Sequence, residues 1–338
     1  MLHTPSLSAA QAAPRNSVAN VARPQRRPAV RPQALAAVDG EIVLATGETV
    51  RYRMLGERAA PLHVLLGGIS ADRCVDDWWQ DLLGVEGSID LRRNAVLSLD
   101  WLQRPRPGQD CIRTSDQSAA LAAVLDALGR SRIDVLMGAS YGAMVGLAFA
   151  ACHPQRIGHL VAISGAHRAS ASATACRWLQ REIIHLAQQA GDNERGIMLA
   201  RALALTSYRP AALFDQRFAA ATPDLQQAGL RDYFVHQGNK LAQRFDLQRY
   251  LSLSASLDQH LVDVSTIRCR VDLVAVRSDH LVPLAQMQAL AAELGARARL
   301  HVLASDYGHD AFLKSTRQLN VLLTRLLTAN GIGDGGDE

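Results

Sequence analysis

Short apolar runs alternate with stretches of helical period along most of this chain. Runs of this kind, bounded by turn residues or charges, are typical of buried strands, and they lie at residues 63–66, 94–100, 133–137, 160–164, 271–276 and 299–303. Residues 114–128, between two of the runs, have the period of an amphipathic helix. We expect Thr114 and Gln117 to form a capping box at its start. Strands that alternate with helices predict an α/β fold with a mostly parallel central sheet.

Two regions depart from this alternation. Residues 41–45 and 50–54 predict an antiparallel pair of short strands that opens the fold. From about 172 to 261 nearly every stretch has a helical period, and helices are predicted at 176–189, 196–205, 211–219 and 230–244. Such an insertion can cover the carboxyl ends of the strands, where open sheets bind their ligands. We therefore predict an α/β core at 39–168 and 263–330 with a helical lid at 169–262.

The pattern G-x-S-x-G at Gly138, Ser140 and Gly142 lies between an apolar run and a stretch of small apolar residues. In a nucleophile elbow the serine sits on a tight strand-to-helix turn at positive φ, and the glycines avoid clashes between neighbouring Cβ atoms. The pattern alone would arise by chance on the order of 0.1 times in such a chain. The predicted strand before it and helix after it are what the elbow requires, so Ser140 is the candidate nucleophile.

A serine nucleophile needs a base, and the base needs an orienting carboxylate. In this fold they follow in the order Ser, Asp or Glu, His, in loops after the last two strands. Asp279 follows the second-last apolar run and His309 follows the last. Asp279 could instead cap the next helix, and Asp306 and Asp310 are further carboxylates, although both lie beside His309 on one loop. Together the residues predict a catalytic triad of Ser140, Asp279 and His309.

The loop after the apolar run at 63–66 reads Gly-Gly-Ile-Ser-Ala. A glycine pair directly after a central strand lets backbone amides point into a cleft, where they can stabilise an oxyanion. We therefore assign the oxyanion hole to the backbone amides of Ile69 and Tyr141, the latter being the residue after the nucleophile. A plain strand-ending turn is the alternative for the glycine loop.

Composition and charge narrow the class of protein. Of 338 residues, 48% are apolar and 20% are charged, as in soluble globular proteins. The net charge of +4 comes from residues 1–38, which hold five arginines and no acid, so the remainder carries −1. That remainder has no charge reason to bind nucleic acid or anionic lipid. We expect 1–38 to be a disordered leader, with a transit peptide as the alternative, and 331–338 to be a disordered tail.

The five cysteines are far apart and form no C-x-x-C pair. This spacing argues for a reducing compartment and against a disulfide framework or a structural zinc site. No apolar run approaches the roughly 20 residues of a membrane span. We therefore expect a cytoplasmic protein that contains no metal.

Several longer motifs resemble the homoserine O-acyltransferases of the MetX type, over roughly residues 64–326. They are Gly-Ala-Ser-Tyr-Gly-Ala-Met around Ser140, Thr-Ser-Tyr-Arg at 206–209, Arg-Phe-Asp-Leu-Gln-Arg-Tyr-Leu at 244–251, Arg-Ser-Asp-His-Leu-Val-Pro at 277–283, and Tyr-Gly-His-Asp-Ala-Phe-Leu at 307–313. The last two together are more diagnostic than any G-x-S-x-G. The resemblance implies an α/β-hydrolase fold with a helical lid.

The resemblance also implies an activity and a set of roles. The enzyme would move an acyl group from acyl-CoA to the hydroxyl of L-homoserine through an acyl-serine, by a ping-pong mechanism, in methionine biosynthesis. Ser140, Asp279 and His309 would form the triad, and Arg209 and Asp310 would contact the amino acid. A guanidinium suits an α-carboxylate, and a carboxylate suits an α-ammonium. A homodimer formed through the helical lid is implied, with no cofactor beyond acyl-CoA as co-substrate.

Two departures from the family pattern bear on the acyl donor. The loop at 102–108 is compact, and the oxyanion loop has the Gly-Gly-Ile-Ser-Ala form, which resembles a shorter branch associated with succinyl rather than acetyl donors. Arg104, Arg106 and Arg113 could meet CoA phosphates or a succinyl carboxylate, or could simply be solvated. A serine O-acyltransferase, a plain serine esterase or hydrolase, and a non-enzymatic binding protein are the alternative functions.

Overall fold

The computed structural model describes residues 37–328. The predicted leader and tail lie outside this part of the chain, except for residues 37 and 38. Within it, the strands form a single sheet in the order β1-β2-β4-β3-β5-β6-β7-β8. The strands are β1 (Val38–Val43), β2 (Thr49–Gly56), β3 (Leu62–Leu66), β4 (Ala95–Leu99), β5 (Ile133–Ala139), β6 (Ile157–Ile163), β7 (Arg270–Val276) and β8 (Ala298–Leu303).

Only β2 runs against the other strands, so it is antiparallel to both of its neighbours. β1 pairs antiparallel with β2, and β2 pairs antiparallel with β4. Every pair from β4 across to β8 is parallel. The predicted α/β-hydrolase fold, with its antiparallel opening pair and mostly parallel sheet, is therefore confirmed.

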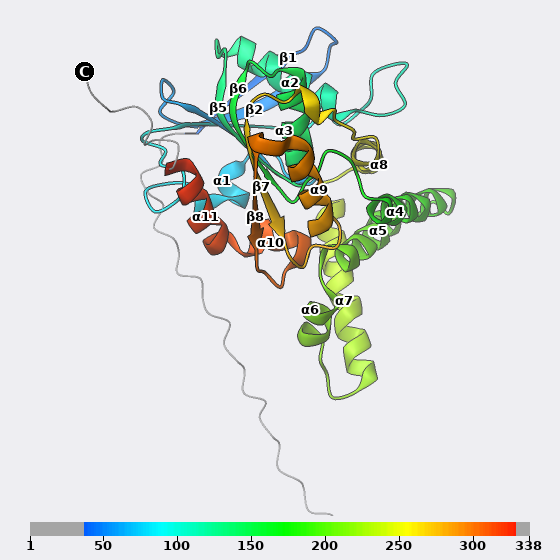
Figure 1. Cartoon of the computed structure of the whole chain (residues 1–338). Coiled ribbons are helices and arrows are strands. Elements are labelled where there is room, and N and C mark those ends of the chain that lie inside the picture. The colour runs from blue at the N-terminus through cyan, green and yellow to red at the C-terminus, as the bar shows by residue number, and fades with distance from the viewer. Residues whose placement is uncertain (1–36, 329–338) are drawn as a thin grey trace, which may run out of the picture. The chain divides into compact units, whose positions relative to one another are not determined.

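Helices cover both faces of the sheet, which explains why the central strands β3 to β7 are buried at nearly every position and mostly apolar. In β3, Val64 and Leu66 belong to the core on one face, while Leu65 belongs to the core on the other. The first core is closed by α2 (Thr114–Ala127), α3 (Tyr141–Cys152) and α9 (Leu284–Leu294), and the second by α1 (Val75–Trp78), α10 (Ala311–Lys314) and α11 (Thr316–Thr328) (Figure 1).

Five helices follow one another between β6 and β7. They are α4 (Ala171–Gln189), α5 (Asn193–Tyr208), α6 (Ala211–Arg217), α7 (Pro223–Ala242) and α8 (Leu247–Asp258). Side chains of Ser170, Asp192, Thr222 and Asp246 cap the first turns of α4, α5, α7 and α8. α4 packs on α5, and α5 packs on α7, so these helices form a group of their own (Figure 1).

The N-cap of α2 lies one residue earlier than predicted, at Arg113, and only the Asp116 side chain takes part in capping. The backbone amide of Arg113 donates to Asp116 Oδ2 at 2.8 Å, so the prediction of Thr114 with Gln117 is wrong. Both predicted side chains have other partners. Gln117 exchanges two hydrogen bonds with the backbone of Leu102, and Thr114 Oγ1 lies 2.8 Å from His260 Nδ1.

Candidate active site

The turn between β5 and α3 holds Ser140 in a strained conformation. Its φ is 55° and its ψ is −116°, a combination that L-residues rarely adopt and that is common at functional sites. The flanking glycines are required by close packing. A Cβ on Gly138 would lie 2.2 Å from the carbonyl oxygen of Gly142, and one on Gly142 would lie 2.2 Å from that of Leu66. The chain therefore forms the nucleophile elbow that its sequence predicts.

The structure brings the three predicted triad residues into one hydrogen-bonded row. His309 Nε2 lies 2.8 Å from Ser140 Oγ, and His309 Nδ1 lies 2.8 Å from Asp279 Oδ2. The other oxygen of Asp279 accepts from the amides of Leu281 and Val282, each at 2.9 Å. Because both carboxylate oxygens are held, the imidazole is fixed with Nδ1–H toward Asp279 and with Nε2 free to accept the serine proton.

Burial and charge act in opposite directions on His309. Burial alone would lower the pKa of the ring, because a charged imidazolium is poorly solvated in the interior. The Asp279 carboxylate, through its charge and its hydrogen bond, together with the charge of Asp310, more than offsets this and raises the pKa of His309 above its ordinary value of 6.5. The residue is 3% exposed, so this balance is set by the protein rather than by solvent.

The other carboxylates near His309 have different positions. Asp306 is exposed, and Asp310 pairs with Arg209. Asp279 does not cap the helix that follows it, because α9 begins at Leu284 with Pro283 as its N-cap. Of the carboxylates considered from the sequence, Asp279 is the one that contacts the histidine ring.

The loop after β3 lies beside the nucleophile. A Cβ on Gly68 would lie 3.9 Å from Ser140 Cβ, and the Gly142 amide donates to the Gly67 carbonyl at 2.9 Å. Among residues 37–328, the backbone amides of Ile69 and Tyr141 have no hydrogen-bond acceptor. Both amides are therefore available to a negatively charged oxygen near Ser140.

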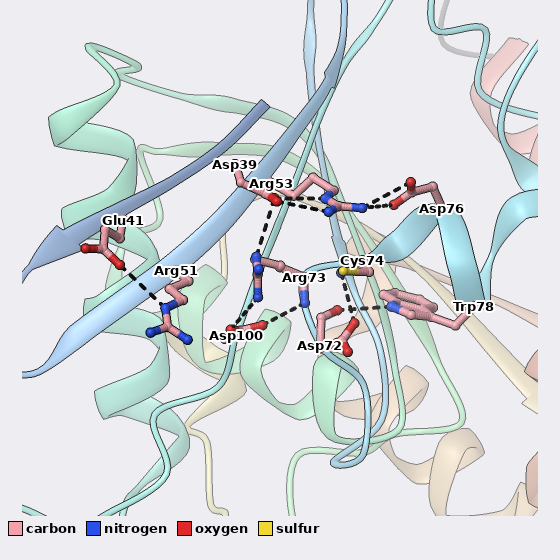
Figure 2. A network of polar contacts seen from close by, with 10 residues as sticks. All are labelled: Asp39, Glu41, Arg51, Arg53, Asp72, Arg73, Cys74, Asp76, Trp78 and Asp100. Carbon is pink, nitrogen blue, oxygen red and sulfur yellow. Dashed lines mark hydrogen bonds and ion pairs between the residues drawn. The ribbon is translucent and has the colours of Figure 1, made fainter. Parts of the chain in front are cut away.

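Ion pairs join the segment after this loop, which contains Arg73 and Asp76, to the strands β1 and β2 (Figure 2). Arg53 on β2 binds Asp39 on β1 and Asp76 on α1, at 2.9 Å each. Arg73 bridges Asp39 and Asp100, the latter at 3.0 Å. A further contact fixes the glycine pair directly, since Trp101 Nε1 donates to the Gly68 carbonyl at 3.1 Å. The antiparallel edge of the sheet thus supports the loop that faces Ser140.

Arg209 and Asp310 lie next to each other. Arg209 Nε and Nη2 both contact Asp310 Oδ2 at 2.7 Å, and Arg209 Nη1 donates to the hydroxyl of Tyr233. Asp310 lines the cavity above Ser140, but Arg209 does not. Arg209 thus lies directly behind a residue of the cavity lining, and its contact with the amino acid stays a prediction.

A cavity of about 390 Å³ opens above the triad. Its floor is formed by Gly68, Ile69, Ser140 and His309, and its wall by residues of α4, α5 and the end of α7. The lining is rich in cations, namely Arg168, Arg177, Arg201, Lys240 and Arg244, and holds the carboxylates Asp72, Asp77 and Asp310. Such a cavity favours an anionic ligand.

The loop arginines considered as contacts for CoA lie elsewhere. Arg104, Arg106 and Arg113 do not line this cavity, and Arg106 pairs with Asp116 and Glu48. The cations that do line it come mainly from the helical insertion. Sequence reasoning missed them because an arginine on an amphipathic helix has no local pattern that separates a cavity-facing position from a solvated one.

No group of three or more His, Cys, Asp or Glu side chains in 37–328 is placed to hold a metal ion. In the same range, none of the helices has the length and apolar character needed to span a membrane.

Comparison with known proteins identifies the class first. The family model for the alpha/beta hydrolase fold matches residues 81–316. A crystal structure of homoserine O-acetyltransferase from Staphylococcus aureus superimposes with a TM-score of 0.72 at 24% identity, covering 90% of this chain and 96% of that one. The fold is therefore that of the α/β hydrolases, as the sheet order and the elbow indicate.

Sequence comparison then narrows the class to a family. A homoserine O-succinyltransferase from Xanthomonas campestris pv. campestris is 38% identical over 90% of this chain and 88% of its own length. A homoserine O-acetyltransferase from Deinococcus radiodurans is 30% identical over 80% of this chain and 83% of its own. The chain belongs to the homoserine O-acyltransferase family.

Proposed function

We propose that this protein transfers an acyl group from acyl-CoA to the side-chain hydroxyl of L-homoserine. The observation that carries the proposal is the Ser140–His309–Asp279 row, with 2.8 Å contacts on both sides of the ring, at the floor of a cation-lined cavity. Its relatives are named for the acylation of homoserine with either a succinyl or an acetyl group.

The first half of the reaction loads the serine. His309 Nε2 takes the proton of Ser140 Oγ while the oxygen attacks the thioester carbonyl. The amides of Ile69 and Tyr141 stabilise the oxyanion, and Asp279 stabilises the imidazolium that forms. The thiolate of CoA leaves with the proton from His309, and the acyl group remains on Ser140.

The second half passes the acyl group to the acceptor. His309 takes the proton of the homoserine hydroxyl, and the resulting oxygen attacks the acyl-serine carbonyl. When the tetrahedral intermediate collapses, His309 returns a proton to Ser140 Oγ. The kinetic mechanism is ping-pong, because CoA leaves before the acceptor reacts.

Asp310 has the chemistry to orient the amino acid. Arg209 contacts only its Oδ2 atom, so Oδ1 is left for the α-ammonium group of homoserine. In this arrangement Arg209 acts through Asp310, because it fixes the carboxylate that faces the cavity. Asp310 would hold the acceptor in line with the acyl-serine, and the helical insertion would keep water out. Both effects favour transfer to homoserine over transfer to water.

Other observations bear on the acyl donor, the cellular location and the oligomeric state. The succinyltransferase relative, the compact loop at 102–108 and the basic cavity together favour succinyl-CoA over acetyl-CoA. The product would then enter methionine biosynthesis in the cytoplasm, with no cofactor required. A homodimer through the helical lid is supported by Trp178, Leu179 and Leu186 on α4, which are 54%, 48% and 64% exposed.

The test is to incubate purified protein with succinyl-CoA or acetyl-CoA, with L-homoserine, with L-serine or without acceptor, and to follow free thiol. We expect fast steady thiol release only with homoserine, faster with succinyl-CoA, and none from Ser140→Ala. Release that ignores the acceptor would identify a hydrolase, and release that prefers serine would identify a serine O-acyltransferase. Full activity of Ser140→Ala would refute the proposed mechanism altogether.

A further inference from the structure

One indole side chain contacts both segments that carry the oxyanion amides. Trp101 follows β4 and is 3% exposed. Its Nε1 donates to the Gly68 carbonyl at 3.1 Å. Its ring meets the ring of Tyr141 edge to face, with 5.0 Å between the centroids and 77° between the planes. Trp101 does not line the cavity, so its effect on the reaction would pass through these two residues.

The bond to Gly68 bears on catalysis because of the peptide unit in which it lies. The Gly68 carbonyl and the Ile69 amide belong to one trans peptide, so they are coplanar and point in opposite directions. A donor that holds the carbonyl on one side therefore sets the direction of the N–H on the other. The hydrogen bond also polarises the peptide, which makes its N–H a stronger donor to a negatively charged oxygen.

The Gly68 oxygen accepts a second hydrogen bond, from the amide of Ala71 at 3.0 Å. That donor belongs to the same turn, so it moves whenever the turn moves. Trp101 belongs instead to the segment that leaves the sheet after β4. Its bond ties the peptide to the sheet, and the sheet also carries Ser140 at the end of β5.

The other end of the loop is tied to the residue before the tryptophan. Asp100 accepts from the backbone amide of Arg73 at 2.9 Å and from its guanidinium at 3.0 Å (Figure 2). Residues 68–73 are therefore held at both ends by two consecutive residues, Asp100 and Trp101. A loop held in this way has little freedom to turn its peptides.

Backbone contacts hold Trp101 itself in place. The amide of Asp100 donates to the Arg51 carbonyl on β2 at 2.8 Å. On the other side, Leu102 and the Gln117 side chain exchange two hydrogen bonds, at 2.9 and 3.0 Å. The indole is thus presented from a fixed backbone, as a group that orients a catalytic peptide has to be.

We propose that Trp101 is a positioning residue for the acyl transfer, which orients the Gly68–Ile69 peptide so that the Ile69 amide points at the oxyanion. The role rests on the proposed acyl-serine chemistry at Ser140. Trp101 touches neither the substrate nor the reacting atoms. Its loss should therefore weaken the binding of a tetrahedral state and leave the binding of the ground state unchanged.

The chain offers a matched pair of variants. Trp101→Phe removes the N–H donor and keeps an aromatic ring against Tyr141. Trp79→Phe is the control, because this indole is fully buried and also donates to a backbone carbonyl, that of Phe312 on α10 at 2.9 Å. Both variants lose one indole hydrogen bond and the same volume, so they should lose similar thermal stability. Trp79 packs in the core on the other face of the sheet.

Two measurements separate effects on the transition state from effects on the ground state. Stopped-flow release of p-nitrophenol from p-nitrophenyl acetate gives the first-order rate constant for acylation of Ser140 and the dissociation constant of the ester. Inhibition of this reaction by propylboronic acid gives the affinity for a tetrahedral adduct, because boron binds Ser140 Oγ and places an oxygen where the oxyanion forms. Neither measurement needs CoA or homoserine.

We expect Trp101→Phe to lower the acylation rate constant about 10-fold and to weaken boronate binding by a similar factor, with the dissociation constant of the ester unchanged. The complete loss of one oxyanion donor costs about 10²- to 10³-fold, and here the Ile69 amide stays but is no longer held in line. Trp79→Phe should keep all three wild-type values. If Trp101→Phe does not fold, 3-benzothienylalanine incorporated at position 101 tests the same bond, since sulfur replaces the N–H in a ring of nearly the same size.

A folded Trp101→Phe with wild-type acylation and boronate binding would overturn the proposal, and so would an equal loss in Trp79→Phe. A weaker dissociation constant of the ester that accounted for the whole loss would assign Trp101 a structural role instead. A wild type that released no p-nitrophenol and bound no boronate would also refute the proposal. Thiol release from acyl-CoA that no acceptor accelerates would refute the proposed transfer to homoserine, but it would leave the result for Trp101 standing.

Discussion

Replacing Asp279 by asparagine changes one non-hydrogen atom of the side chain. It should move the ring proton of His309 from Nδ1 to Nε2. Oδ1 of the side chain accepts from the amides of Leu281 and Val282, and an asparagine oxygen can keep those two bonds. Its NH₂ group then takes the place of Oδ2, 2.8 Å from His309 Nδ1. An amide NH₂ only donates, so Nδ1 must offer its lone pair and the ring proton moves to Nε2. In that tautomer the ring cannot accept the proton of Ser140.

The expected cost follows from this tautomer. The equivalent substitution in the serine-protease triad lowers kcat about 10⁴-fold without disturbing the geometry, which corresponds to about 5 kcal/mol of lost transition-state stabilisation. Asp279 and asparagine have nearly the same volume, and both amide donors keep their acceptor. We therefore expect Asp279→Asn to fold normally and to lose about 10⁴-fold in kcat.

The assay is thiol release from succinyl-CoA with L-homoserine, and near-ultraviolet circular dichroism monitors the fold. Asp306→Asn is the matched control, because this carboxylate lies on the loop of His309 but is exposed. The control should keep wild-type kcat. If Asp279→Asn stayed within about tenfold of the wild type, or if Asp306→Asn carried the loss, the assignment of Asp279 would be wrong.

Three further predictions test other parts of the site. Because nearby carboxylates, Asp279 above all, raise the pKa of His309 above 6.5 and only the neutral ring is a base, kcat/KM should fall with decreasing pH through a midpoint above 6.5. In Asp279→Asn only the charge of Asp310 still opposes the effect of burial, so the midpoint should move lower. An unmoved midpoint would contradict the electrostatic argument. In Gly138→Ala the new Cβ would lie 2.2 Å from the Gly142 carbonyl oxygen. The melting temperature should therefore fall by several degrees, or no soluble protein should form. An unchanged melting temperature would show that the elbow is looser than described. Trp178→Glu places a charge on the exposed apolar face of α4, where the proposed dimer would form. Light scattering after size exclusion should give the dimer mass for the wild type and the monomer mass for the variant. Equal masses would show that α4 is not part of the interface.

The sequence was sufficient to predict the sheet and the hydrogen-bonded row of Ser140, His309 and Asp279, because both depend on local or strictly ordered patterns. The central strands β3 to β7 are buried at nearly every position, so each appears as a mostly apolar run. Gly138 and Gly142 mark the elbow because no side chain fits beside the backbone there. Asp279 and His309 follow the last two parallel strands, and parallel strands bring their carboxyl ends to one edge of the sheet.

The contacts of the cavity wall could not be predicted in this way. The pairing of Arg209 with Asp310 joins residues 101 positions apart. Arg177 reaches Asp258 across 81 positions. Which arginine of an amphipathic helix finds a buried partner depends on how α4, α5 and α8 pack, and several registers of these helices satisfy the same period of apolar residues.

The helical insertion can determine which acceptor reacts at a Ser–His–Asp row that many α/β hydrolases share. The elbow supplies Ser140, and the loops after the last two strands of the core supply Asp279 and His309; such a row suits attack on any activated carbonyl. Selection between water, serine and homoserine has to come from groups that touch the acceptor. Asp310 belongs to the catalytic loop, yet Arg209, from the end of α5, holds one of its oxygens. Because His309 and Asp310 are consecutive, a shift of α5 that released Arg209 would disturb the acceptor site and the base together.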